Sequence, residues 1–180
     1  YGKLTGHFGE SSAVSAFYLK NVQGLDGNSV DPDIKGAHVH AWGAGATIDL
    51  GDSGLNIDGD FIQTRGNRDL GHANLWTAGL NYGKVDLNKP GSFTLGVHYV
   101  RADAGAYLLG NSALDMTDQL EYGWDNGTGV KFWVAKAGVA VQKNVELDAY
   151  YNFGAKAFDR YDDSTKDPAN TWGVELNYAF

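Results

Sequence analysis

The chain has 180 residues, no cysteine and a formal net charge of −8 at pH 7. Without cysteine, disulfides, thiolate catalysis and cysteine-ligated zinc are excluded. The acidic balance argues against a nucleic-acid partner, because phosphate binding needs clustered Lys and Arg, and the length suits a single domain over residues 1–180.

Glycine is frequent and proline scarce, with 25 and 3 copies, and aromatic residues make up 13% of the chain. The mean hydropathy is only −0.34, which is typical of a membrane barrel whose lipid face is diluted by a polar lumen and loops. There is no run of about 18 apolar residues that would predict a transmembrane helix. The first residues have neither a basic start nor an apolar core. We therefore expect either that a signal peptide has been removed or that the numbering begins inside a longer chain.

Most of the chain alternates large apolar residues with polar or small ones at a period of two, which predicts β-strands with one apolar face. The first two segments alternate weakly and the later ones regularly. In chain order, the predicted strands are 1–9, 12–21, 37–50, 55–65, 74–85, 92–100, 127–142, 145–155 and 171–180.

The last predicted strand shows this pattern most plainly. Every second residue is large and apolar and would share one face of the strand: Trp172, Val174, Leu176, Tyr178 and Phe180. A tilted strand crosses a bilayer in about 9 to 11 residues, which is close to the length of this segment. The alternative is an edge strand of a soluble sandwich, since half-buried strands alternate in the same way.

Connections between the predicted strands alternate in length. The long ones are 22–36, 66–73, 101–126 and 156–170, and the short ones are 51–54, 86–91 and 143–144. Membrane barrels alternate in this way, with long external loops and short periplasmic turns. If the last strand runs down to a periplasmic C-terminus, every long loop is extracellular.

Large aromatic residues stand on the apolar faces at two heights. A soluble barrel would point these faces inward and would have no reason to sort aromatic residues by height, whereas rings settle at both interfaces of a bilayer. We predict that two membrane girdles contain Trp42, Trp76, Tyr82, Phe93, Tyr99, Trp133, Tyr151, Trp172, Tyr178 and Phe180.

The opposite face of the strands is acidic and rich in glycine. Side chains fill the interior of a narrow eight-stranded barrel, and unpaired carboxylates there would each cost several kcal/mol. The pattern therefore favours a wide, wet lumen, unless the carboxylates pair with Lys or Arg of strands that we have assigned wrongly. The predicted pore-lining residues are Asp49, Asp58, Asp60, Thr77, Asn81, His98, Lys136, Glu146, Asp148, Asn152, Glu175 and Asn177.

Two segments carry a family resemblance: GVKFWVAKAGVAVQKNVELDAYYNFG at 129–154 and NTWGVELNYAF at 170–180. They resemble the C-terminal part of the outer-membrane porins of diderm Firmicutes. The resemblance implies a barrel that is generally a trimeric porin, following a wall-binding S-layer-homology domain and a coiled coil. This chain has no counterpart of the wall-binding domain and is short for a porin barrel, so wall tethering is not carried over to it.

We therefore predict an all-β fold, a transmembrane antiparallel up-and-down β-barrel. Eight or nine strands are visible, and they are expected to be part of a larger even-stranded barrel of about 16 strands. The predicted function is that of an outer-membrane porin, a passive channel for small hydrophilic solutes with a mild preference for cations. Expected partners are outer-membrane lipids and lipopolysaccharide, the barrel assembly machinery through the C-terminal strand, and two further copies in a homotrimer.

A closed barrel that serves only as a structural anchor is the alternative, and an enzyme is a further one. Outer-membrane proteases and lipid hydrolases keep their acids, His and Ser near the outer rim. Residues near that level are His38, His40, His72, His98 and Asp103. No set of Ser, His and acid can be placed within hydrogen-bond reach from these positions, so we expect no catalytic residue.

Acidic residues raise the question of metal binding at two places. Asp58 and Asp60 resemble a fragment of a calcium loop, but the ligand spacing that leads to a Glu at the twelfth position is absent. The acids of the last loop either bridge divalent cations to neighbouring lipopolysaccharide or are simply solvated; they are Asp159, Asp162, Asp163 and Asp167. We expect neither a metal site nor a cofactor.

Overall fold

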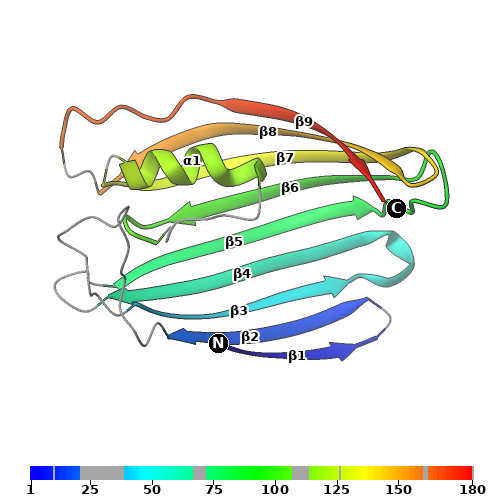
Figure 1. Cartoon of the computed structure of the whole chain (residues 1–180), viewed down its shortest axis with the longest axis horizontal. Helices are drawn as coiled ribbons and strands as arrows, with labels where there is room; N and C mark the ends of the chain where they lie inside the picture. The colour runs from blue at the N-terminus through cyan, green and yellow to red at the C-terminus, as the bar shows by residue number, and fades with distance from the viewer. Residues whose placement is uncertain are drawn as a thin grey trace.

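The structure is a computed structural model, and it describes residues 1–9, 11–20, 39–66, 72–106, 114–125, 127–159 and 162–179. Its nine strands form one sheet in chain order, each antiparallel to the next (Figure 1). The strands are β1 (Gly2–Phe8), β2 (Ser12–Lys20), β3 (Val39–Asp49), β4 (Leu55–Gly66), β5 (His72–Gly83), β6 (Phe93–Ala102), β7 (Gly129–Gln142), β8 (Val145–Phe158) and β9 (Thr171–Tyr178). The predicted all-β, antiparallel fold with strands in sequential order is thereby confirmed.

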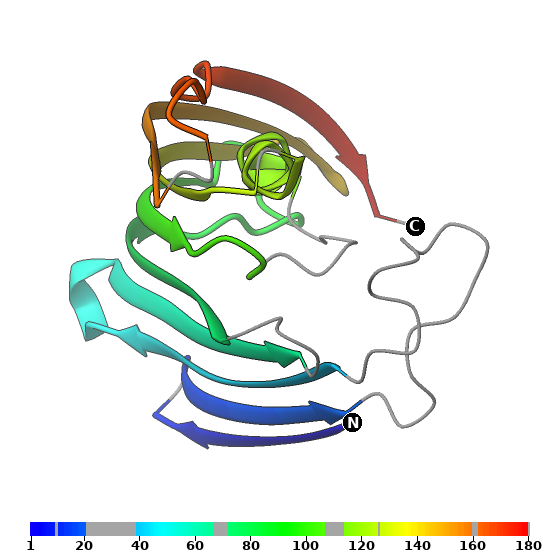
Figure 2. The ribbon, with the colours of Figure 1, turned by 90° about the vertical axis from the view of Figure 1, so that its left-hand side faces the viewer.

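One sheet forms a deep trough. Figure 2 shows it curving from β1 through β5 to β9, and the two edge strands are not paired with each other, so the sheet is not closed. The connections β1–β2, β3–β4, β5–β6 and β7–β8 lie at the same end of the trough as the C-terminus (Figure 1). We call this the turn end, and the opposite end the loop end.

The turn end contains the tight connections that the sequence predicts. A 3-10 helix, η1 (Gly51–Ser53), joins β3 to β4, and Gly54 follows it with a φ of 70°. Lys143 and Asn144 join β7 to β8, and Asn144 has a φ of 61°. Both residues adopt the left-handed conformation, which glycine adopts freely and asparagine more easily than most other residues.

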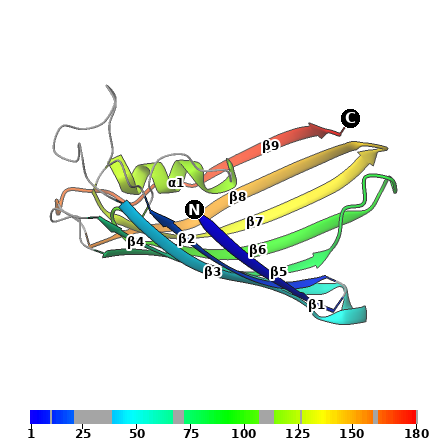
Figure 3. The same ribbon diagram turned by 60° about the horizontal axis from the view of Figure 1, so that its bottom comes forward.

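The prediction was wrong in the connection 101–126, where no helix was expected. α1 (Leu114–Asp125) lies there, inside the trough, on the concave face of the sheet (Figures 2 and 3). It packs against β7, β8 and β9. None of the helices in the described part of the chain has the length and hydropathy of a membrane-spanning helix.

A second correction concerns β8, which runs three residues beyond the predicted end at 155. Gly154 has a φ of 64°, and the register between β7 and β8 shifts between Lys131 and Trp133. Such a bulge adds one residue to a strand and reverses the side-chain parity beyond it. The alternation predicted for this strand therefore holds only as far as Gly154. Beyond it the even-numbered Lys156 lies on the convex face, where it pairs with Lys131.

A small dry core lies between α1 and the concave face. Leu120 of α1 packs with Val100, Val130, Phe132 and Val134 of the sheet, all 5% exposed or less. Most other large apolar side chains of the described strands lie exposed on the convex face. The arrangement is the reverse of a soluble sheet, which buries its apolar face.

Candidate functional site: the concave face

All twelve predicted pore-lining residues lie on strands, with their side chains on the concave face. Asn152 is nevertheless buried, with only 1% of its surface exposed. Its Nδ2 donates a hydrogen bond to Thr171 Oγ1 at 3.0 Å. Gln119 of α1 donates to the same hydroxyl at 3.4 Å. The part of this face near α1 is therefore packed, while the part towards the turn end is open.

Four polar side chains on β4, β5 and β6 form a network that we call the Asp58 cluster: Asn56, Asp58, Asn81 and His98. Asn81 Nδ2 donates to Asn56 Oδ1 at 2.9 Å and also contacts Asp58 Oδ1. His98 Nε2 lies 3.1 Å from the same Asp58 oxygen. The carboxylate thus has partners from two neighbouring strands, as a partly buried charge requires.

Glycines on the concave face let these side chains lie flat across neighbouring strands. A Cβ at Gly79 would overlap the His98 ring, and a Cβ at Gly96 would overlap the Asn81 amide. The same close approach brings Asp60 over Gly45. Side chains that lie along the sheet rather than across the trough leave its interior more open.

Replacing Gly79 with alanine should therefore break the Asp58 cluster by displacing His98. We expect a loss of about 1–3 kcal/mol in the free energy of unfolding, the usual cost of overpacking. Equilibrium unfolding in urea measures it. Gly6→Ala is the matched control, because nothing lies within 4 Å of a Cβ at Gly6.

The double variant Gly79→Ala/His98→Ala tests the cause. If the overlap with the ring is responsible, the double variant is less destabilised than the sum of the two single changes. Additive losses, or a Gly79→Ala loss no larger than that of Gly6→Ala, would show that the ring does not depend on the glycine.

A second acidic group lies on β7–β9, towards the turn end. Asp148 Oδ2 accepts a hydrogen bond from Asn177 Nδ2 at 2.8 Å, and Asp148 is the register partner of Glu175. A Cβ at Gly138 would lie 2.6 Å from Asp148 Oδ1 and 3.1 Å from Glu146 Oε1. The face thus places several carboxylates close together, an arrangement that water must stabilise.

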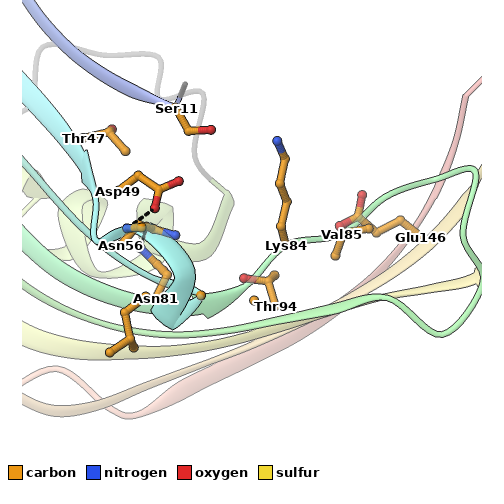
Figure 4. Close-up of a pocket in the computed structure, with 13 residues that line it drawn as sticks. Ser11, Thr47, Asp49, Asn56, Asn81, Lys84, Val85, Thr94 and Glu146 are labelled. Atoms are coloured by element: carbon orange, nitrogen blue, oxygen red, sulfur yellow. Dashed lines mark hydrogen bonds between the residues drawn. The ribbon is translucent and has the colours of Figure 1, made fainter. Parts of the chain in front are cut away.

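An open hollow of about 530 Å³ lies at the turn end of the concave face (Figure 4). It is lined by predicted residues and also by Asn56, Lys84 and Thr94, which were not among the predicted pore-lining residues. Asn56 and Thr94 have the parity of the polar face, so the alternation alone was signal enough to find them. Lys84 brings a cation to a hollow that Asp49 and Glu146 also line.

The predicted girdle residues lie on the opposite, convex face, apart from Phe180, which is outside the described residues. Their rings contact across strands: Trp76 and Tyr99 lie 5.2 Å apart, and Tyr99 and Trp133 4.9 Å apart, between ring centroids. Trp133 is 43% and Trp172 74% exposed. The indoles thus do not pack into a dry centre.

The residues considered for catalysis do not come together, and His38 is outside the described residues. His40 accompanies Tyr18 on the convex face, with Tyr18 Oη 3.0 Å from His40 Nδ1. His98 lies on the concave face in the Asp58 cluster, and Asp103 accepts hydrogen bonds from Asn74. Within the described ranges, no three potential metal ligands gather.

The acids of the last loop are engaged locally. Asp162 accepts hydrogen bonds from Ser164 N and Oγ at 2.8 and 2.7 Å, and these bonds lower the pKa of the Asp162 carboxyl below its usual value. Asp167 pairs with Lys156 at 2.8 Å and accepts a bond from Ala157 N. Both carboxylates thus help to shape this loop.

No protein-family model matches this chain, and no curated protein shows significant similarity to it.

Proposed function

We propose that the chain forms part of a bacterial outer-membrane β-barrel, and that the barrel is a porin, a water-filled channel for small hydrophilic solutes with a mild preference for cations. The observation that carries this proposal is the division of one sheet into an exposed apolar convex face and an acidic concave face. Lipid would cover the first and water the second, as in membrane barrels.

The distribution of charge and rings supports this orientation. On the described strands, every Asp and Glu has the concave parity: Asp49, Asp58, Asp60, Glu146, Asp148 and Glu175. Rings stand near both ends of the convex face, with Trp76, Tyr99 and Trp133 towards the loop end and Tyr82 and Phe93 in contact towards the turn end. Rings of this kind settle at the two interfaces of a bilayer.

The unpaired edges of β1 and β9 support a larger barrel. Backbone groups in hydrocarbon must be paired, so a sheet that spans a membrane has to close. We propose that further strands complete an even-stranded barrel of about 16 strands, three copies of which form a homotrimer. The turn end and C-terminus would face the periplasm, where the last strand engages the assembly machinery, and the loops would face outward among lipopolysaccharide.

Stepwise current in a planar bilayer is the test of the channel. A purified sample that inserts but gives no current steps would refute it. Insertion is monitored separately by faster migration on a denaturing gel before boiling, which is typical of intact membrane barrels.

Cation preference is tested with the double variant Glu146→Gln/Glu175→Gln, which removes two concave charges with little change in shape. In a salt gradient, its reversal potential should move towards zero, because fixed carboxylates attract cations into the pore. The matched control Asp52→Asn/Asp163→Asn removes two exposed charges from the β3–β4 turn and the last loop, and should leave the potential unchanged. An unchanged potential in the concave variant would contradict the proposed role of these acids.

A closed structural anchor is the second candidate, and the position of α1 favours it. The helix covers the concave face of β7, β8 and β9, where Tyr122 Oη donates to Lys166 O and Gln119 Nε2 donates to Ala169 O at 2.8 Å. A helix held in this way takes up part of the interior. Inserted protein without current would favour the anchor.

A further inference from the structure

Three cationic residues stand side by side on the convex face at the loop end. The strand register pairs Arg101 of β6 with Lys131 of β7, and Lys131 with Lys156 of β8. The bulge at Gly154 brings Lys156 into this row. We call Arg101, Lys131 and Lys156 the cation row.

The cation row lies directly beside the rings of Tyr99 and Trp133 on the convex face, on the side of the loop end. Tyr99 lies two residues from Arg101 on β6, and Trp133 lies two residues from Lys131 on β7, in both cases towards the turn end. Two residues span about 7 Å along a strand. If the rings mark the membrane interface, the cations lie at the level of the lipid headgroups.

Further basic residues stand on other strands of the convex face, closer to the loop end, and the described strands contribute no acid to this face. A second register row joins Lys20, His40, Arg65 and His72 across β2 to β5. None of the described strand residues with convex parity is Asp or Glu. The turn end of this face has no corresponding row of cations within the described strands.

Like charges directly opposite each other on neighbouring strands destabilise a sheet unless an anion lies between them. Lys156 already has one, since Asp167 lies 2.8 Å from its ammonium group. Arg101 and Lys131 are less well compensated. Lys131 forms no ion pair with any other described residue.

The guanidinium of Arg101 is held in place by its described neighbours, but its N–H groups are not all engaged in hydrogen bonds with them. Its guanidinium lies 4.3 Å above the centroid of the Phe158 ring. Its Nε is 3.8 Å from Asp103 Oδ1, beyond hydrogen-bond length, and the other oxygen of Asp103 accepts two bonds from Asn74. Stacking engages the face of a guanidinium and leaves the N–H groups at its edge available to an anion.

We propose that Arg101 and Lys131 bind a phosphate group of a phosphorylated lipid in the outer leaflet. This inference rests on the proposed membrane orientation. A guanidinium fork beside a lysine matches the charge and the acceptors of a phosphate monoester. The site adjoins rings that would contact acyl chains, so the phosphate belongs to a lipid and not to a free anion.

Native mass spectrometry of the detergent-solubilised protein tests the proposal. The probes are a bis-phosphorylated glucosamine lipid, the same lipid after dephosphorylation, and inorganic phosphate as competitor. We expect the wild type to prefer the phosphorylated lipid, and Arg101→Gln/Lys131→Gln to bind it about tenfold more weakly, the usual effect of lost charged hydrogen bonds. Arg101→Lys keeps the charge and should lose less.

The matched control Lys89→Gln/Lys143→Gln removes the same charge from the turn end and should keep the wild-type affinity. Equal binding of both lipids, or an equal loss in the control, would overturn the proposal. Inorganic phosphate that displaces the lipid at equal concentration would overturn the choice of a lipid. A wild type without channel current that still binds in this selective way would refute the channel and leave the lipid site intact.

Discussion

Replacing Phe132 with alanine is expected to destabilise the protein by about 3–5 kcal/mol, the cost of deleting a large aromatic side chain from a dry core. Phe132 is 0% exposed and lies among the residues that α1 covers on the concave face. Neither lipid nor water reaches this position, so the cavity would remain empty. Equilibrium unfolding in urea, with the protein in lipid vesicles, measures the loss.

The same truncation on the other face is the control. Phe93 is 44% exposed on the convex face, where lipid would fill the space that the ring leaves. Phe93→Ala should therefore cost only the transfer of the ring, about 1–2 kcal/mol. Hydrogen exchange gives a second readout, because Phe132→Ala alone should expose the amides of α1. Equal losses at the two positions would mean that the packing of α1 does not stabilise the fold.

Strand faces could be predicted because side-chain parity depends only on the backbone period. Phe132 and Trp133 are both large and adjacent, and alternation alone assigned them to opposite faces, which is where they lie. Strand order followed from the short connections, since neighbouring antiparallel strands need only tight turns.

The bulge and the helix could not be predicted in the same way. The bulge depends on the φ of one glycine among 25, and nothing in the pattern distinguishes Gly154 from the others. The helix depends on contacts of Gln119 and Tyr122 with a loop 44 to 52 residues further along the chain. The stretch 114–122 contains neither glycine nor proline and is rich in helix formers, and this was the available signal.

The sequence pattern could predict which residues lie on the concave face, but not which of them contact one another. Whether Asp58 meets Asn81 and His98 depends on the register of three strands. Register is set by turn geometry as well as by the apolar pattern. The cation row illustrates the same limit, because Lys156 joins it only through the bulge.

Introducing arginine at Ala78 is expected to be the most damaging single change on the convex face. Ala78 lies in the middle of β5, exposed, opposite Gly59 and Tyr99 in the register. On β5 it stands between Trp76 and Tyr82, which belong to the two proposed girdles. If hydrocarbon covers this stretch, an arginine there costs at most about 2–4 kcal/mol, the value for the bilayer centre. The folded fraction in lipid vesicles, measured by urea titration, should fall accordingly.

Thr77→Arg is the decisive control, because it places the same charge one residue away on the concave face. There the arginine would meet water and the carboxylate of Asp60, whose backbone N–H bonds to the Thr77 hydroxyl at 3.2 Å, so only the loss of that bond is expected. A water-soluble sheet would reverse the comparison, because its exposed convex face would accept arginine at Ala78 without cost. The sign of the difference between these neighbouring variants therefore decides whether hydrocarbon or water covers the indoles.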